Sequence, residues 1–528
     1  MVTIPQRLLG EALLNSTKTD PGKIAVIVKG VSYSYAQLKA SAENFAHHLI
    51  NSGLEKGDRV AIYLDNSWES VVSIYGTTLA GGVFLVINPQ TKSDKLNFIL
   101  NDSGAKVLIT TSSLKNEFLP ALENASGVQE IIVTGDPFSH NAVLNVRLVD
   151  FETAISKAEN VSKLPDIIPN DLAALIYTSG STGFPKGVMM THQSMVFTSW
   201  SLIQYLRLNE NDRIMLLLPL AFDYGLYQLL MAVTIGGTLI VEQSFIFLAS
   251  VCENIEKYKP TVFPGVPTIY AMLISYCKKN NIKFESIEKV TNTAAALPDE
   301  IIPDLKNIFP HALIFKMYGL TECKRVCYLE PELVDSKPGS VGKAIPGTEV
   351  FLLSTEGEPV APGTPGILHI RGPHVMLGYW NREDLSNVML KTGKLPGERI
   401  LCSNDWFKMD EDGFLYFLGR NDDIIKTRGE KVSPVEVENI IYAIEGVKEV
   451  IVLGMPDNVL GESVVAVVTI NDGASVNDRI IHRTCMTHLE SFMVPGKIIV
   501  LQEMPKSPNG KIDKKELKKL LHNGSFES

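Results

Sequence analysis

The chain lacks any Cys-x-x-Cys pair, any excess of basic residues and any long uninterrupted apolar run. None of its six cysteines has the spacing of a zinc site or of a disulfide scaffold, and such scattered cysteines are typical of a reducing compartment. The formal net charge of −10 argues against a nucleic-acid-binding protein, which would carry a basic patch. A local basic rim that meets an acidic partner protein stays compatible with this charge.

Membrane and export signals are also missing. The longest apolar region, residues 214–241, is interrupted by Pro219, Asp223, Gln228 and a glycine pair, so we expect no membrane span. The N-terminus has neither the basic start nor the apolar run of a signal peptide. We therefore expect a cytoplasmic enzyme with no nucleic-acid and no membrane partner.

The order of apolar segments predicts an α/β fold. With 528 residues the chain is too long for one hydrophobic core, so two or more domains are expected. Short apolar runs at 58–64, 82–87 and 106–110 alternate with helical patterns, which predicts a largely parallel sheet with helices on both faces. Beyond Lys337 the Gly- and Pro-rich turns predict a β-rich subdomain.

A domain boundary is predicted near Gly419-Arg-Asn-Asp-Asp423. We expect a large N-terminal domain of doubly wound sheets over residues 1–421, with the β-rich subdomain at about 338–420. Residues 422–528 are expected to form a small α+β domain. Ser433-Pro-Val-Glu436 has the pattern of a capping box with proline at the first helical position, and predicts a helix to Glu445.

The most informative loop is Tyr177-Thr-Ser-Gly-Ser-Thr-Gly-Phe-Pro-Lys-Gly187, which follows a predicted buried strand at 172–176. Its backbone N–H groups and hydroxyls can face a polyphosphate, and Lys186 supplies a point charge. The Gly-Lys-Ser/Thr order of a P-loop is absent. The alternative is a flexible surface loop, which the buried strand and Lys186 argue against. We expect the loop to be poorly ordered without nucleotide.

Five motifs occur in order over more than three hundred residues, and together they resemble the adenylate-forming superfamily of acyl-CoA synthetases, luciferases and amino-acid adenylation enzymes. A chance match to one motif is easy, but chance matches would not keep the order. The motifs are Tyr177–Gly187, Tyr318-Gly-Leu-Thr-Glu322, Asp405 in Ser-Asn-Asp-Trp, Gly419-Arg-Asn-Asp-Asp-Ile-Ile-Lys-Thr-Arg-Gly429 and Pro505-Lys-Ser-Pro-Asn-Gly-Lys511.

The resemblance implies that a carboxylate attacks the α-phosphate of ATP to give an acyl-adenylate and pyrophosphate, with Mg²⁺ present. It implies three catalytic residues: Lys511 bridges the acid and the α-phosphate, Lys186 holds the β- and γ-phosphates, and Glu322 is the Mg²⁺ ligand. Without the motifs, Lys511 would be a solvated charge and Glu322 an ordinary surface or capping carboxylate.

The resemblance also implies the nucleotide contacts. Tyr318 and Phe417 sandwich adenine, although core packing is the alternative for both rings. Asp405 and Arg420 contact ribose, and Arg428 contacts phosphate. Asp422 is the hinge about which the small domain moves as a lid between the two half-reactions. The remaining expected ATP contacts are Thr178, Ser179, Gly180, Ser181, Thr182, Gly183, Gly319, Thr321 and Ala295, the last in a Thr293-Ala-Ala-Ala296 stretch where relatives carry glycines.

Asp223 bears on which acid is activated. It matches the aspartate with which amino-acid adenylation enzymes bind the substrate α-ammonium, and the resemblance implies that Phe222 is the aromatic residue near the carboxylate tunnel. Its surroundings and Thr321-Glu-Cys-Lys-Arg-Val326 look most like stand-alone ligases that load L-proline onto a peptidyl carrier protein. Tyr224, Tyr227 and Met317 are then candidate pocket walls. We expect the carrier protein, with its phosphopantetheine, to act in trans.

Other interpretations stay open. Asp223 can instead be an N-cap or part of an ion pair inside the protein. In that case the chain is an AMP-forming acyl-CoA ligase for a small carboxylic acid, with coenzyme A as acceptor. A non-catalytic adenylate-binding homologue is disfavoured by the joint presence of Lys511, Glu322 and Asp405. Lys324 and Arg325 have no assigned role, and either line the pocket or face solvent.

Overall fold

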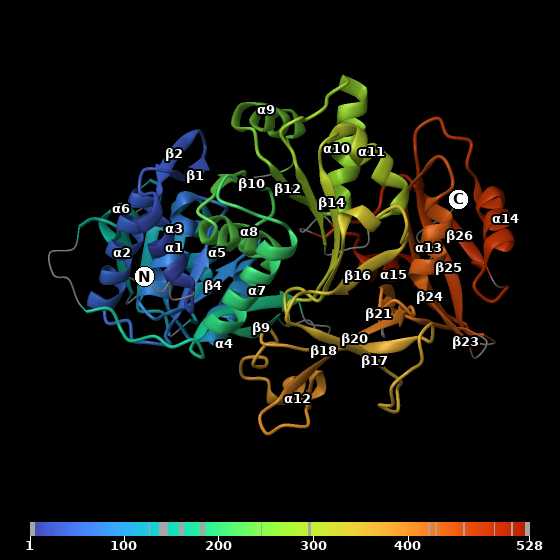
Figure 1. The fold of residues 1–528 in the computed structure, drawn as a ribbon. Helices are drawn as coiled ribbons and strands as arrows, with labels where there is room; N and C mark the ends of the chain where they lie inside the picture. The colour runs from blue at the N-terminus through green and yellow to red at the C-terminus, as the bar shows by residue number, and fades with distance from the viewer. Residues whose placement is uncertain are drawn as a thin grey trace.

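A computed structural model describes residues 6–125, 127–136, 146–157, 163–179, 185–243, 245, 247–293, 297–420, 423–427, 430–457, 460–489, 491–507 and 511–522. Figure 1 shows the N-terminal elements, in blue, on the left and the green and yellow strands in the centre. The smaller C-terminal unit, in orange and red, lies on the right. Within the described ranges, no helix is both long and apolar enough to cross a membrane.

The first sheet has seven strands and is parallel except for its last strand, β9, which pairs antiparallel with β8. The strands lie in the order β7 (Arg147–Asp150), β6 (Glu130–Thr134), β5 (Ala105–Thr111), β3 (Arg59–Tyr63), β4 (Val83–Ile87), β8 (Leu172–Ser179) and β9 (Pro185–Thr191).

The second sheet has fourteen strands and changes from parallel to antiparallel along its width. The parallel part contains β1 (Ile24–Val28), β11 (Thr238–Val241), β10 (Arg213–Leu216), β12 (Val262–Gly265), β13 (Lys289–Asn292) and β14 (Leu313–Tyr318), with β2 (Val31–Ser34) antiparallel at its edge. The antiparallel part continues through β15 (Cys327–Leu329), β16 (Ser340–Ala344), β21 (Leu415–Arg420), β20 (Arg399–Met409), β18 (Gly366–Arg371) and β17 (Glu349–Leu353), and β19 (Leu390–Thr392) pairs with β20. The β-rich part therefore extends the same sheet.

Residue alternation along the strands explains why helices cover both faces. In β3, Val60 and Ile62 join the larger core, whereas Ala61 and Tyr63 join a second core. Successive strand side chains point to opposite faces, so a fully apolar strand requires cover on both sides. The larger core holds residues of α1 (Leu9–Thr19), α2 (Tyr35–Asn51), α3 (Trp68–Leu79), α7 (His192–Tyr205) and α8 (Asp223–Thr234); the second holds α4 (Ser93–Ser103) and α5 (Lys115–Leu122).

The remaining helices of the large part lie along its sheets and connections. They are α6 (Phe151–Ala154), α9 (Leu248–Tyr258), α10 (Pro267–Asn280), α11 (Ile302–Ile308) and α12 (Glu383–Met389), with 3-10 turns at Ser112–Leu114, Asp299–Ile301 and Pro331–Leu333. All six cysteines are free, and five of them are buried.

The C-terminal unit has its own five-stranded sheet and its own cores. Its strands are β23 (Glu430–Val432), β22 (Ile425–Thr427), β25 (Gly461–Ile470), β24 (Val447–Asp457) and β26 (Lys497–Leu501). Alternate residues of β25 pack against α13 (Pro434–Tyr442) and α14 (Asp478–His488) on one face and against α15 (Lys514–His522) on the other.

The α/β fold with a large N-terminal part and a smaller C-terminal part is as the sequence predicts. The Ser433 side chain accepts from the Glu436 backbone N–H and begins α13, which ends at Tyr442 rather than at Glu445. The expected hinge, Asp422, lies outside the described residues.

Candidate active site

The predicted phosphate loop connects β8 and β9, which form a hairpin in which Thr178 is opposite Lys186. Gly180, Ser181, Thr182 and Gly183 lie outside the described residues, and only the backbone of Ser179 is described. The Thr178 hydroxyl is buried and has no hydrogen-bond partner among the residues that the structure describes. A buried hydroxyl without a partner is costly, so it is available to a ligand at this point.

The loop after β14 carries Glu322 and is tightly folded. A Cβ on Gly319 would lie 2.2 Å from the carbonyl oxygen of Lys324, so the loop cannot close with a larger residue there. Lys324 itself has φ +64, in the left-handed region. Thr321 is half-buried, and Glu322 is buried with its carbonyl accepting from the Met376 N–H at 2.8 Å. The backbone thus fixes the position of the Glu322 carboxylate.

Lys186 and Glu322 come together, with Tyr379 between them. The Lys186 Nζ lies 3.3 Å from Glu322 Oε1 and donates to the Tyr379 hydroxyl at 2.6 Å. That hydroxyl donates to the same Glu322 oxygen at 2.5 Å. The Tyr379 ring also faces the ammonium, 4.0 Å from its centroid. Burial and the Glu322 charge raise the pKa of Tyr379, so the phenol stays a donor.

The residues predicted to bind adenine and ribose lie together: Tyr318 contacts both Phe417 and Asp405. The rings of Tyr318 and Phe417 are inclined by 28°, with centroids 5.8 Å apart. A third ring between them would need about 7 Å, or two van der Waals contacts. An adenine sandwich therefore requires the rings to separate. The Tyr318 hydroxyl donates to the Asp405 carboxylate.

Asp405 is buried, and desolvation raises its pKa to about 6 against the lowering effects of Tyr318 and Arg420. Arg420 lies opposite on β21, with its Nε 3.9 Å from Asp405 Oδ1, and its side chain is mostly exposed. Two further predicted nucleotide contacts, Ala295 and Arg428, lie outside the described residues.

Lys511 reaches the site from the C-terminal unit. Its side chain is accessible to water, yet protein atoms enclose it closely enough that desolvation lowers its pKa. The Asp223 carboxylate opposes this lowering, and the Arg420 charge adds to it. Lys511 therefore lies in the same electrostatic environment as Asp223 and Arg420.

Asp223, predicted to hold a substrate ammonium, has a cationic partner within the protein. It is the first residue of α8, and its Oδ2 lies 3.4 Å from the Lys324 Nζ. The same ammonium lies over the rings of Tyr224 and Tyr227, at 5.4 and 4.9 Å from their centroids. Lys324 is 2% exposed, and burial lowers its pKa to about 7. It does not face solvent.

Arg325 is also buried, which excludes a solvent-facing role for it. It donates to the Thr293 hydroxyl and lies 5.6 Å from the centroid of the Tyr224 ring, and within the described part of the chain its Nε has no hydrogen-bond partner. The Tyr224 hydroxyl is held by the Thr291 carbonyl at 2.6 Å, and Met317 accepts from Tyr205 through its sulfur at 2.9 Å.

The described cavity beside Asp223 is small, about 10 Å³, which is room for a single water. Apolar side chains surround it, and Tyr224, Tyr227 and Met317 do not line it. Phe222, half-buried, precedes α8 as its N-cap. The residues that line the cavity besides Asp223 are Phe84, Val86, Leu175, Ile176, Leu220, Ala221 and Leu226. An acid larger than water would enter this cavity only if side chains moved.

The charged groups suit Mg²⁺ held mainly by a nucleotide. Among the described residues, no cluster of three or more His, Cys, Asp or Glu side chains could hold a metal. Mg²⁺ commonly uses one or two protein carboxylates together with phosphate oxygens and water. Glu322 beside Lys186 fits that requirement, and a bound metal would offset phosphate charge there.

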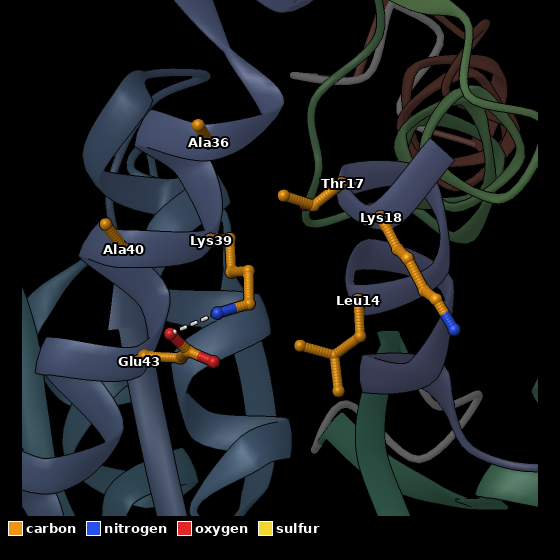
Figure 2. Close-up of a pocket in the computed structure, with 7 residues that line it drawn as sticks. All are labelled: Leu14, Thr17, Lys18, Ala36, Lys39, Ala40 and Glu43. Atoms are coloured by element: carbon orange, nitrogen blue, oxygen red, sulfur yellow. Dashed lines mark hydrogen bonds and ion pairs between the residues drawn. The ribbon is translucent and has the colours of Figure 1, made fainter. Parts of the chain in front are cut away.

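A larger hollow of about 330 Å³ lies on the surface between α1 and α2. Figure 2 shows its two walls, with Leu14, Thr17 and Lys18 on α1 and Ala36, Lys39, Ala40 and Glu43 on α2; the Leu14 and Thr17 side chains point toward α2, and Lys18 points away from it. Lys39 bonds Glu43 across one turn of α2 at 2.6 Å. No residue predicted for the active site lines this hollow.

Two site residues were not predicted from the sequence. Tyr379 has no sequence signal that connects it with Lys186 or Glu322, because the contact arises only when segment 376–380 lies beside β9. One indication for Lys324 was present in the sequence, because this lysine follows Glu322 of the Tyr318–Glu322 motif by two positions. Its partner, Asp223, is 101 positions away, so the pair was not evident.

Models of protein families match both parts of the chain: "AMP-binding enzyme" over residues 13–380 and "AMP-binding enzyme C-terminal domain" over residues 436–511. The chain belongs to the AMP-binding enzyme family. It is 31% identical to a long-chain-fatty-acid–CoA ligase of Bacillus subtilis, covering 97% of this chain and 94% of that protein. It is 28% identical to a linear gramicidin synthase of Brevibacillus parabrevis over 98% of this chain but only 6% of that protein.

Solved structures agree with this membership. The anthranilate CoA ligase AuaEII in complex with anthranoyl-AMP superposes with a TM-score of 0.90 at 25% identity, covering 99% of both chains. The o-succinylbenzoate CoA synthetase of Bacillus subtilis, in complex with ATP and magnesium ion, gives 0.81 at 27% identity over 96% of this chain and 99% of that one. The chain is an AMP-forming ligase of this superfamily, which uses ATP with Mg²⁺ to adenylate carboxylic acids.

Proposed function

We propose that this AMP-binding enzyme activates a small amino acid, with L-proline as the first candidate, and passes it to the phosphopantetheine thiol of a peptidyl carrier protein. The observation that carries the proposal is the position of Asp223. Its carboxylate acts electrostatically on Lys511 and lies 3.4 Å from a buried ammonium, that of Lys324.

The electrostatic interaction between Asp223 and Lys511 favours an α-amino acid. Lys511 is the residue proposed to hold the reacting carboxylate against the α-phosphate. In an α-amino acid the ammonium is attached to the carbon next to that carboxylate. A carboxylate whose charge acts on Lys511, as that of Asp223 does, is therefore a suitable partner for an α-ammonium.

The contacts of Lys324 support the same proposal. Its ammonium lies against a carboxylate and over two tyrosine rings, which are the contacts that a substrate ammonium would use. The ammonium of a bound amino acid would replace Lys324 as the partner of Asp223, and the Lys324 side chain would move away from Asp223. The ring of proline would then pack against Tyr224 and Tyr227, with one N–H group bonded to Asp223 and the other to a carbonyl.

One observation favours a second candidate, an acyl-CoA ligase for a small acid without an ammonium group. The Asp223–Lys324 pair already balances both charges, so such an acid would leave the pair in place. The fatty-acid and anthranilate ligases among the similar proteins are named as CoA ligases, and coenzyme A would then be the acceptor here.

ATP–pyrophosphate exchange with matched acids separates the two candidates. L-Proline and cyclopentanecarboxylate have the same ring size and differ in the ring ammonium. We expect exchange with L-proline and little with cyclopentanecarboxylate, and we expect Asp223→Ala to abolish the preference. Exchange with cyclopentanecarboxylate and related acids alone would contradict the amino-acid proposal.

Lys324→Met gives a second, independent comparison. If an ammonium replaces Lys324, this variant keeps or improves the KM for L-proline. If the ion pair is permanent, the variant leaves Asp223 without a partner and lowers exchange with every acid. The acceptor is then identified by offering coenzyme A and a phosphopantetheinylated carrier protein in parallel and measuring thioester formation.

A further inference from the structure

Tyr379 connects the two charged residues of the phosphate end. Its hydroxyl accepts from Lys186 at 2.6 Å and donates to Glu322 at 2.5 Å, and its ring lies under the Lys186 ammonium. Tyr379 is only 2% exposed. One side chain thus contacts both the lysine proposed for the β- and γ-phosphates and the carboxylate proposed for Mg²⁺.

The backbone around Tyr379 connects the same two elements. The Met376 N–H donates to the Glu322 carbonyl at 2.8 Å, and the Trp380 N–H donates to the Gly187 carbonyl at 2.8 Å. Between them, the Leu377 N–H donates to the Met189 carbonyl at 3.0 Å. Segment 376–380 therefore holds the β9 strand, which carries Lys186, next to the loop that carries Glu322.

The segment itself is fixed from its other side. The Tyr379 N–H donates to the Ser386 hydroxyl at 2.8 Å, and Ser386 donates to the Arg382 carbonyl at 2.7 Å. Gly378 has φ +147, and a Cβ there would lie 2.9 Å from the Ser386 Oγ. The Trp380 indole N–H donates to the Asp102 carbonyl at 3.0 Å. Tyr379 therefore stands on a backbone with little freedom.

This rigidity matters because Lys186 is a long side chain next to an opposite charge. With no other restraint, its ammonium would lie anywhere along the Glu322 carboxylate, or in solvent. The Tyr379 hydroxyl accepts from the Lys186 ammonium and donates to the Glu322 carboxylate, so it fixes the position of both charged groups. Because the hydroxyl is uncharged, both groups keep their charge. The ring adds a cation–π contact that fixes the height of the ammonium.

We propose that Tyr379 is a positioning residue of the nucleotide site, which holds Lys186 and Glu322 in the relative position that the β- and γ-phosphates and their Mg²⁺ require. Tyr379 acts through these two residues. The inference is independent of which acid the enzyme activates.

The test measures nucleotide binding by calorimetry without any acid. Tyr379→Phe keeps the ring and removes the hydroxyl, and Tyr379→Leu removes both. Since hydrogen bonds to charged groups are strong, we expect Tyr379→Phe to weaken binding of ATP with Mg²⁺ about tenfold or more, and Tyr379→Leu to weaken it further.

AMP binding distinguishes loss of the positioning of Lys186 and Glu322 from a general disturbance of the nucleotide site, because AMP lacks the β- and γ-phosphates. We expect AMP to bind both variants with the wild-type affinity. Tyr63→Phe is the matched control, since Tyr63 is also buried and its hydroxyl donates, among the described residues, only to the carbonyls of Pro89 and Thr91. We expect Tyr63→Phe to bind ATP as wild type.

Two results would overturn the proposal. One is wild-type affinity of Tyr379→Phe for ATP with Mg²⁺. The other is an equal loss of AMP and ATP binding, which would mean that the substitution disturbs the fold of the site. An unfolding curve of each variant distinguishes a misfolded protein from a weakened one, and Tyr379→Phe is the variant that keeps the packing volume.

Discussion

Asp405 and Arg420 are direct cross-strand neighbours on β20 and β21, and the Arg420 Nε lies 3.9 Å from Asp405 Oδ1. The pair is unequal, because Asp405 is buried and Arg420 is mostly exposed. An exposed arginine only partly offsets the desolvation of a buried carboxylate, so the pKa of Asp405 is raised to about 6.

Ribose recognition is expected to weaken in acid. Asp405 must be ionised to accept from both ribose hydroxyls, and it becomes protonated as the pH falls through about 6. The measurement is the ratio of the KM values of 2′,3′-dideoxy-ATP and ATP between pH 5 and 8, in which the titration of the phosphates cancels. We expect the preference for ATP to decline below pH 6. In Asp405→Asn the ratio should be small and independent of pH; a pH-dependent ratio in that variant would contradict the assignment.

The Asp223–Lys324 pair is expected to respond asymmetrically to substitution. Asp223→Asn leaves the buried Lys324 without its counter-charge. Because burial holds the pKa of Lys324 at about 7, the amine can lose its proton at neutral pH, and the loss of stability grows below pH 7, where removing one partner of a buried ion pair typically destabilises by about 3 kcal/mol. Lys324→Met replaces the buried cation with an apolar side chain, while Asp223 keeps its access to water. We expect the unfolding temperature of Asp223→Asn to fall clearly below wild type at pH 5 and that of Lys324→Met to be nearly unchanged. Equal losses in the two variants would show that packing, rather than charge, controls the site.

Lys511→Ala is expected to separate the two half-reactions. Removing a cation that stabilises developing charge lowers adenylation about a hundredfold or more, whereas thioester formation from supplied acyl-adenylate is largely kept. The control is Lys506→Ala, because Lys506 lies on the same loop but pairs with Glu449 at 2.9 Å. Equal loss of both half-reactions in Lys511→Ala would exclude the assignment.

Asp422→Pro is expected to slow thioester formation more than adenylation. Proline fixes φ, and the proposed rotation of the C-terminal unit needs freedom at this position. The two half-reactions are timed separately in rapid-quench experiments with one enzyme preparation. Wild-type rates for both steps would place the hinge elsewhere.

Gly319→Ala is expected to damage the loop that carries Glu322. A Cβ there would lie 2.2 Å from the Lys324 carbonyl oxygen, and an overpacked contact of this kind costs about 1–3 kcal/mol. We expect lower stability together with weaker ATP binding. At Gly22 the nearest atom to an added Cβ is the Asp20 Oδ1, at 3.8 Å, so Gly22→Ala should be neutral in both measurements.

The elements that follow sequence periodicity were predictable, and contacts between distant segments were not. The apolar run at 58–64 and the Ser433 cap depend on neighbours in the sequence, and the structure places a strand and a helix start there. The Asp223–Lys324 pair and the Tyr379 contacts depend on how β14, α8 and segment 376–380 pack together, which no local pattern encodes. Asp223 therefore had several possible partners until the fold was available.

The fourteen-stranded sheet has a consequence for the order of events. Tyr318, Asp405, Phe417 and Arg420 all lie on strands of this one sheet, and Arg420 is its last residue before the C-terminal unit. A rotation that begins beyond Arg420 would carry Lys511 away and leave the four others in place. The adenylate could then stay bound while Lys511 leaves the site and the incoming thiol takes its place. AMP would be released only after the thioester has formed.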